Sequence, residues 1–169
     1  DDVPPDSPGH LLPVGQGLTF KDHRDSIRRP LDLSLKTLMK KGYAYRYQHE
    51  DVENVYFDPL KFGGFGKLAH LDMSEWPRKK RRFHLDTYPG TPWNKGDFVL
   101  WHGCKKSESV CWDTVIGRGR PAWNIQDAAM VTKHLGFTID VACGGIDNLV
   151  RHHDYTMAIT EAVSGKRFA

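Results

Sequence analysis

Residues 117–153 constrain the fold of this chain more than any other stretch. They contain a glycine- and proline-rich turn, a helical pattern over 124–135, and an apolar run over 137–142 that is typical of a strand. A Gly-Gly-Ile-Asp turn follows at 144–147, and a second helical pattern comes after it. This order of elements, with small residues at the strand-to-helix crossing, is typical of half of a nucleotide-binding α/β unit. We therefore expect an α/β fold for the C-terminal part.

Cap residues predict the ends of the two helices in this stretch. Asn124 is expected to cap the first helix and Gly136 to end it. Asp147 or Asn148 is expected to cap the second helix, which runs to about Gly165.

The N-terminal half predicts one helix and one hairpin. Leucines at helical spacing follow Pro30, and Gly42 suits the position just after the last turn. Residues 43–47 and 54–58 alternate as paired strands would, and Pro59 should end the second strand. Residues 97–101 predict a further strand, and the segment 73–95 is expected to form loops with short strands.

The composition is typical of a globular protein, and the chain is long enough for one domain with a hydrophobic core. The chain has 169 residues, of which 39% are hydrophobic and 27% are charged. Its longest apolar runs are too short for a membrane span, and its N-terminus has no signal-peptide pattern, so we expect no membrane partner.

The three cysteines, Cys104, Cys111 and Cys143, are an odd number, which favours a reducing cytoplasm. Cys104 and Cys111 match no standard zinc spacing, even with His102 nearby, and are expected to be free thiols.

A basic block has two interpretations. The net charge is only +3, but five consecutive residues are cationic: Arg78, Lys79, Lys80, Arg81 and Arg82. Such a block is either a solvated surface or a patch that contacts RNA phosphates. Composition alone favours the solvated surface.

Six short phrases occur in the order found in one known family. They are Lys-Gly-Tyr-Ala-Tyr at 41–45, Val-Tyr-Phe-Asp at 55–58, Phe-Gly-Lys-Leu at 65–68, Asp-Phe-Val-Leu-Trp at 97–101, Gly-x-Gly-Arg-Pro at 117–121 and Gly-Gly-Ile-Asp at 144–147. With these phrases the chain resembles cysteinyl-tRNA synthetase, a class I aminoacyl-tRNA synthetase, over most of 31–169.

The resemblance implies the fold class, the domains and the reaction. It implies the second half of a class I Rossmann-like catalytic domain, at 104–169, preceded by a connective α+β insertion at 31–103 and an irregular lead-in at 1–30. The family activates an amino acid with ATP and transfers it to tRNA. Its two phosphate-binding signatures lie in parts of the catalytic domain that this sequence does not contain. We therefore expect a piece of a longer protein that needs those missing parts and does not form an adenylate alone.

The resemblance also shows a departure at the metal site. The family selects cysteine with a zinc ion that binds the substrate thiolate. Asp127 stands where the family has a cysteine ligand, His152 keeps the histidine, and Thr156 replaces a glutamate. No zinc is therefore expected at Asp127, His152 and Thr156. A site rebuilt from Cys143, His152 and Asp127 is the alternative.

Two groups of site residues follow from the same resemblance. The implied nucleotide-binding residues are Gly144, Gly145, Asp147, His152 and His153. The implied amino-acid pocket consists of Trp123, Asp127, Ala142, Cys143 and Thr156.

The sequence thus predicts part of a divergent ATP-dependent ligase. Its partners would be ATP, an amino or organic acid, and tRNA or another acceptor. The alternative is a non-catalytic module or subunit that binds nucleotide or tRNA.

Overall fold

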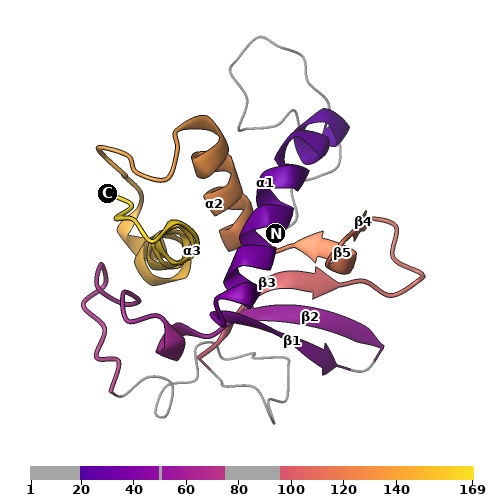
Figure 1. The fold of residues 1–169 in the computed structure, drawn as a ribbon, viewed down its shortest axis with the longest axis horizontal. Helices are drawn as coiled ribbons and strands as arrows, with labels where there is room; N and C mark the ends of the chain where they lie inside the picture. Colours follow the sequence, from indigo (N-terminus) through magenta and orange to yellow (C-terminus); the bar gives the residue numbers. More distant parts are fainter. Residues whose placement is uncertain (1–19, 50, 75–95) are drawn as a thin grey trace.

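The fold combines one sheet with a group of helices (Figure 1). The computed structural model describes residues 20–49, 51–74 and 96–169, without the side chains of residues 20–27 and 49. In chain order the elements are α1 (Phe20–Lys40), β1 (Ala44–His49), β2 (Val52–Phe57), the 3-10 turn η1 (Pro59–Lys61), β3 (Phe98–Gly103), β4 (Trp112–Thr114), β5 (Gly117–Pro121), α2 (Trp123–His134), the 3-10 turn η2 (Ile146–Asn148), the π-helix η3 (Leu149–Asp154) and α3 (Tyr155–Ser164).

The sheet has five strands in the order β1-β2-β3-β5-β4, and every pair of neighbours is antiparallel. The β1–β2 hairpin confirms the prediction from the alternating pattern, with Ala44 opposite Phe57. Pro59 follows the end of β2 and begins η1, as expected from its missing N–H group. The strand predicted at 97–101 is β3.

Hydrogen bonding in the sheet continues through the boundary predicted between residues 103 and 104. Strand β3 pairs with β5 through Trp101 opposite Pro121 and Gly103 opposite Gly119. One sheet therefore joins strands from the two units that the sequence suggested, and the division into those units stays a prediction.

Helix α1 begins earlier than the sequence predicted. We expected it to start after Pro30, but it starts at Phe20 and continues through the proline. Proline costs a helix one hydrogen bond and clashes with the preceding turn. The fully buried face begins immediately afterwards, with Leu31, Leu35 and Leu38, so packing fixes the helix on the C-terminal side of the proline. Gly42 ends it with a positive φ of 77°, as predicted.

The core lies where the helices meet the sheet. Helix α1 packs against α2 and α3 and against the first strand, as Figure 1 shows. Aromatic rings join the layers: Phe98 of β3 stacks on Phe57 at 4.8 Å between ring centroids and on Tyr155 of α3 at 3.9 Å. This contact fixes the start of α3, and with it the end of η3, against the sheet.

The strand predicted at 137–142 is absent. The segment is irregular, and Val141 is 73% exposed. Its backbone is tied to the C-terminal end of the chain by one bond, from the Ile139 N–H to the Phe168 carbonyl. A strand needs a neighbour that accepts and donates along its whole length, and among the described residues this segment has none. The observed fold is therefore mixed α/β with an antiparallel sheet, and the strand expected at 137–142 is not formed.

Two predicted helix caps are also wrong. Helix α2 begins at Trp123 after Ala122, so Asn124 lies inside the first turn instead of capping it. The Ala122 N–H donates to the Leu100 carbonyl, which ties the residue before the helix to the sheet. Asn148 stands at the N-cap position of η3, but its side chain makes no capping hydrogen bond, and Asp147 lies inside the turn η2. The predicted C-terminal end is confirmed by Gly165, with φ 71°.

Several expectations fall outside the described residues: the irregular lead-in up to residue 19 and most of the segment 73–95, including the basic block 78–82. None of the helices in the described part is both long and apolar enough to cross a lipid bilayer.

Candidate functional site

Asp127 and His152 form the centre of the candidate site. Asp127 lies in the second turn of α2 and His152 lies in η3, and these elements pack against each other. The Asp127 Oδ2 and His152 Nδ1 atoms are 3.6 Å apart, and both side chains are about one-third exposed. Burial raises the pKa of Asp127, and the neighbouring imidazoles of His152 and His153 partly oppose that rise. The structure therefore pairs a carboxyl group with an imidazole.

The other residues predicted for the amino-acid pocket occupy different surroundings. Thr156 lies one helical turn after His152 and is buried, whereas Trp123 is 38% exposed at the start of α2. Ala142 and Cys143 lie in the exposed irregular segment before the Gly-Gly turn. The structure places Asp127 and His152 beside each other, and the pocket as a whole stays a prediction.

The Gly144–Gly145 turn is covered by side chains that follow it. A Cβ atom on Gly144 would overlap the His153 ring, and one on Gly145 would overlap the Asp147 carboxylate. The His153 Nε2 atom is also 3.3 Å from the Gly145 carbonyl oxygen. We expected these glycines to leave room for a nucleotide. In the structure the close approach to the backbone is made by the protein's own imidazole and carboxylate.

Asp154 is a functional candidate that the sequence pattern did not single out. It is fully buried at the junction of η3 and α3, and its Oδ2 atom accepts a hydrogen bond from the Ala69 N–H at 3.0 Å. Its Oδ1 atom is buried without a hydrogen-bond partner. Asp154, which directly follows His153 in the chain, thus fastens the loop around Ala69 to the junction of η3 and α3. In the sequence Asp154 follows Arg151, His152 and His153, so its burial against a loop 85 residues earlier in the chain could not be predicted.

Burial makes Asp154 a source of pH-dependent stability. Desolvation raises its pKa, and backbone N–H groups of the 66–69 loop together with His70 oppose the rise. A carboxyl whose folded-state pKa is raised stabilises the fold below its unfolded pKa, about 3.9, and loses that contribution as pH rises through the folded value. Asp154→Asn removes this titration. The unfolding free energy of wild type minus that of Asp154→Asn should therefore fall as pH increases from about 3.9 upward.

Denaturant unfolding at a series of pH values measures that difference. Asp140→Asn, at an exposed aspartate, shows the effect of removing one carboxylate outside the core. A wild-type advantage that stays level or grows with pH would show that burial does not dominate at Asp154.

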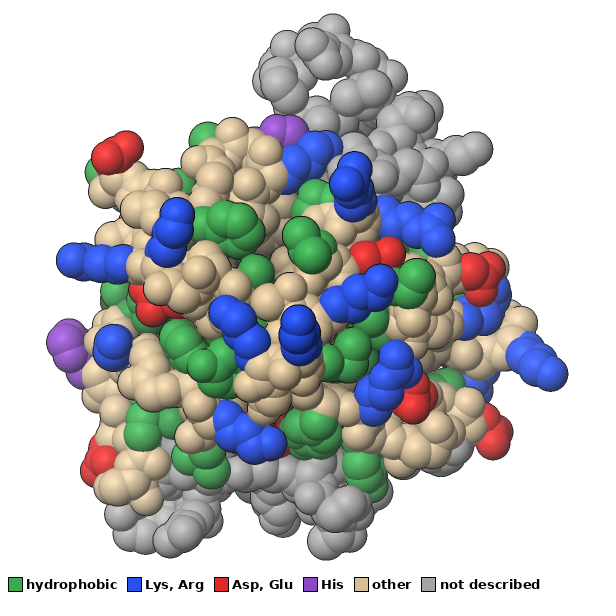
Figure 2. Space-filling view, in the orientation of Figure 1, with side chains coloured by type: hydrophobic (Ala, Val, Ile, Leu, Met, Phe, Trp, Pro, Cys, Tyr) green, Lys and Arg blue, Asp and Glu red, His purple; other side chains and the backbone are tan. Residues whose placement is uncertain are grey.

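A basic hollow on α1 was also missed. Its volume is about 460 Å³, and it is lined by Arg28, Arg29, Asp32, Leu33 and Lys36. Figure 2 shows Lys and Arg side chains spread over the face of the molecule that includes α1, with hydrophobic side chains between them. The cations Arg29, Lys36 and Lys40 recur at helical spacing. This spacing could have predicted a basic helix face, but the prediction from sequence covered only the basic block at 78–82.

The prediction of free thiols at Cys104 and Cys111 is wrong. The structure joins these two residues in a disulfide, and Cys143 is the exposed free cysteine. The turn between β3 and β4 brings the two residues together, which their linear spacing did not reveal.

This geometry defines a mixed α/β protein with a carboxyl–imidazole pair beside a glycine turn. Residues 23–169 match the family described as the tRNA synthetases class I (C) catalytic domain. The chain belongs to this family.

Named relatives agree with that assignment. The chain is similar to cysteine–tRNA ligases of Geobacillus sp. (strain WCH70), with 38% identity over 135 residues, and of Bacillus pumilus (strain SAFR-032), with 39% over 142 residues. The ligase of Oceanobacillus iheyensis is 40% identical over 135 residues. Each match covers 80% of this chain and 27% of the relative, so the chain spans about a quarter of the length of these relatives.

The donor atoms at the family's zinc positions do not fit a tetrahedral zinc site. A structural or catalytic zinc takes three or four thiolate, imidazole or carboxylate ligands. Asp127 and His152 supply two, and Thr156 offers only a neutral hydroxyl. Among the described residues, Cys143 does not join them in a group of three donors within 4.8 Å, and the rebuilt site stays a prediction.

Proposed function

We propose that this chain is part of a cysteinyl-tRNA-synthetase-like ATP-dependent ligase that selects an acid other than cysteine. The observation that carries the proposal is the pairing of Asp127 with His152 at positions where the family holds zinc. A carboxyl group beside an imidazole recognises polar or charged groups of a substrate, whereas zinc recognises a soft thiolate.

Selectivity for cysteine has no clear physical basis in this donor set. Without a metal, a pocket distinguishes side chains of similar size by about 1–3 kcal/mol. The His152 imidazole offers an N–H donor for an acidic or hydroxyl-bearing substrate. Burial raises the pKa of the Asp127 carboxyl, which favours the protonated form that can donate a hydrogen bond to a substrate.

The glycine turn is the proposed adenosine corner. Asp147 is exposed in the first turn of η2, where its carboxylate can accept hydrogen bonds from ribose hydroxyls. Gly144 and Gly145 would let the nucleotide approach the backbone once the His153 ring moves aside. In this proposal His153 covers the corner when it is empty and contacts the nucleotide when it is filled.

A second candidate is a non-catalytic module that binds nucleotide or tRNA. The observation in its favour is the same His153 ring, which occupies the space over Gly144. If that ring stays in place, ATP cannot approach the turn. The basic hollow on α1 would then be a candidate for phosphate contacts with tRNA, together with the predicted patch at 78–82.

Amino-acid-dependent pyrophosphate exchange in the full-length protein tests the first candidate. A ligase that forms an acyl adenylate releases pyrophosphate, and the reverse reaction incorporates labelled pyrophosphate into ATP only when the right acid is present. Across a panel of amino and organic acids, we expect an acid other than cysteine to give the strongest signal. Asp147→Ala should reduce that signal by about tenfold or more, because loss of one charge-assisted hydrogen bond costs about 1.5–3 kcal/mol.

The control is Asp140→Ala, which removes an exposed carboxylate outside the glycine turn. A strong cysteine-specific signal would contradict the proposed specificity. Exchange that Asp147→Ala leaves unchanged would contradict the adenosine corner, and no exchange with any acid would favour the binding module.

A further inference from the structure

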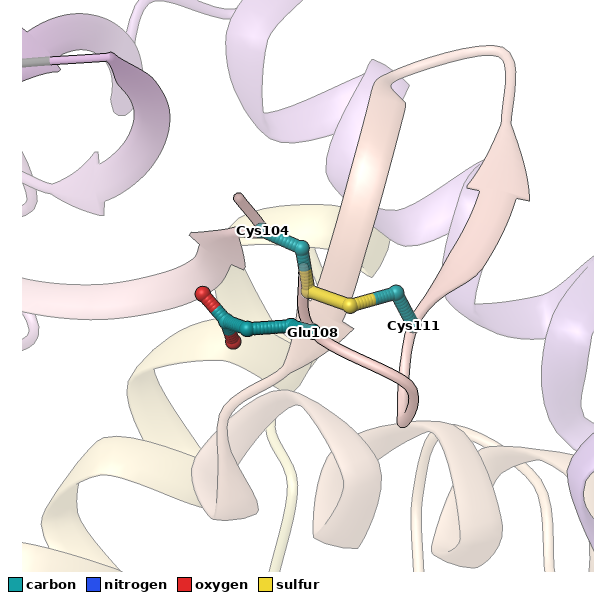
Figure 3. A group of neighbouring side chains, drawn as sticks. All are labelled: Cys104, Glu108 and Cys111. Atoms are coloured by element: carbon teal, nitrogen blue, oxygen red, sulfur yellow. A yellow bond between two sulfur atoms is a disulfide. The ribbon is translucent and has the colours of Figure 1, made fainter. Parts of the chain in front are cut away.

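The loop between β3 and β4 brings together three metal-binding side chains. Sγ of Cys104, Sγ of Cys111 and a carboxylate oxygen of Glu108 all lie within 4.8 Å of one another. Figure 3 shows the Glu108 side chain beside the two sulfur atoms, which form a disulfide. Both cysteines are half-buried and Glu108 is exposed, so small ions from solvent can reach the group. In the described parts of the chain, no other group of three such side chains is this close.

The loop is held in shape by hydrogen bonds that do not involve the sulfurs. The Glu108 carboxylate accepts from the Lys105 N–H at 3.0 Å, and the Glu108 N–H donates to the Lys105 carbonyl at 3.1 Å. Arg118 of β5 donates to the Glu108 carbonyl at 3.0 Å, and the Cys104 N–H donates to the Arg118 carbonyl at 3.2 Å. These bonds fix Glu108 next to the cysteines and fasten the loop to the sheet. They can persist when the disulfide is opened.

The donor set matches a thiophilic divalent cation. Two thiolates and one carboxylate are ligands that zinc prefers, and three protein ligands leave a fourth position for water. Two sulfurs at about 2.3 Å from a tetrahedral zinc stand about 3.8 Å apart. The Cα atoms of Cys104 and Cys111 are 6.3 Å apart, so side-chain rotation can produce that separation.

We propose that, in its reduced form, the 104–111 loop binds one zinc-like divalent cation through Cys104, Cys111 and Glu108. The disulfide and the metal complex exclude each other. A dithiol reductant opens the disulfide, giving two cysteine thiols and one oxidised reductant. The cation then binds as the two thiols release their protons to solvent.

This site is distinct from the zinc positions of the family. Those positions fall at Asp127, His152 and Thr156, on α2, η3 and α3, whereas the proposed site lies on the loop that connects β3 to β4. The proposal therefore stands whether or not the ligase function does.

Cobalt binding to the whole chain tests the proposal. Protein reduced with a phosphine, then freed of it without oxygen, is titrated with Co²⁺, which reports thiolate ligands by a sulfur-to-cobalt charge-transfer absorption. Reduced wild type should bind one equivalent with this absorption, and the oxidised protein should show none. Cys143→Ser is the matched control, because it removes the exposed cysteine outside the group, and it should bind like wild type.

Variants of the three ligands give the decisive comparison, with circular dichroism confirming that each is folded. Cys104→Ser and Cys111→Ser should lose the absorption expected for two thiolates. Glu108→Gln should keep both sulfurs but weaken Co²⁺ binding by at least about tenfold, since even loss of an outer partner of a metal ligand has that effect. The proposal is overturned if reduced wild type lacks the absorption. It is also overturned if the Cys104→Ser/Cys111→Ser double variant retains the absorption, or if Glu108→Gln binds as tightly as wild type.

Discussion

Replacing Gly119 by alanine should lower the free energy of unfolding by about 3 kcal/mol or more, at the upper end of the cost of overpacking a core. Gly119 is buried in β5, directly beside β3, and a Cβ atom there would overlap both the Trp101 indole nitrogen and the His102 carbonyl oxygen. Overpacking usually costs about 1–3 kcal/mol. Here one of the overlapping atoms is backbone in a neighbouring strand, so the strands must separate.

Chemical denaturation of the variant and of Gly63→Ala measures the effect. Gly63 has no atom within 4 Å of the position that a methyl group would take and no positive φ, so it controls for the general effect of adding a methyl group. Equal stability of both variants would show that β3 and β5 can separate without cost. A large loss at Gly119 alone would give the second glycine of the Gly-x-Gly-Arg-Pro phrase a packing role, independent of any ligand.

Replacing Phe98 by alanine should cost about 3–5 kcal/mol, as expected for deleting a buried ring. Phe98 is 1% exposed and lies between Phe57 and Tyr155, so its removal leaves a cavity in the aromatic contact between the sheet and α3. The loss should appear as a lower denaturation midpoint. Phe137→Ala, at a ring that is 37% exposed, should lose far less.

The Phe98 variant also probes the candidate site from a distance. Tyr155 directly follows Asp154 and lies close after His152 in the chain, so a looser aromatic contact frees the end of η3. A variant as stable as wild type would mean that neighbouring side chains fill the cavity.

The sequence predicted correctly those features that depend on residues close together in the chain. The β1–β2 hairpin, the leucine face of α1 and the glycines at 42 and 165 depend on contacts between residues close in the chain. Each could be predicted because alternation, helical spacing and positive φ are properties of short segments.

Features that need distant partners could not be predicted in the same way. The apolar run at 137–142 has the composition of a strand but no neighbour to pair with in the described residues. The Cys104–Cys111 disulfide depends on how the β3–β4 turn folds back. The role of Asp154 became visible only when the loop around Ala69 was placed against it.

The family itself was recognisable from short phrases, yet the phrases did not assign chemistry. The resemblance implied that Asp127 and His152 stand at metal-ligand positions, which stays a prediction, and the structure shows that the two side chains are 3.6 Å apart. The sequence did not predict that the His153 ring lies over Gly144. That position depends on the π-helix η3, and the spacing of residues does not predict a π-helix.

The pairing of β3 with β5 bears on how such a protein could be recombined. In a chimaera joined between residues 103 and 104, β3 from one parent would pair with β5 from the other. Trp101 of the first parent would then pack against Gly119 of the second. We expect such a chimaera to fold only if the side chains of the two parental strands fit together where β3 pairs with β5. In the design of chimaeras, residues 98–121, which contain β3, β4 and β5, should therefore be exchanged together.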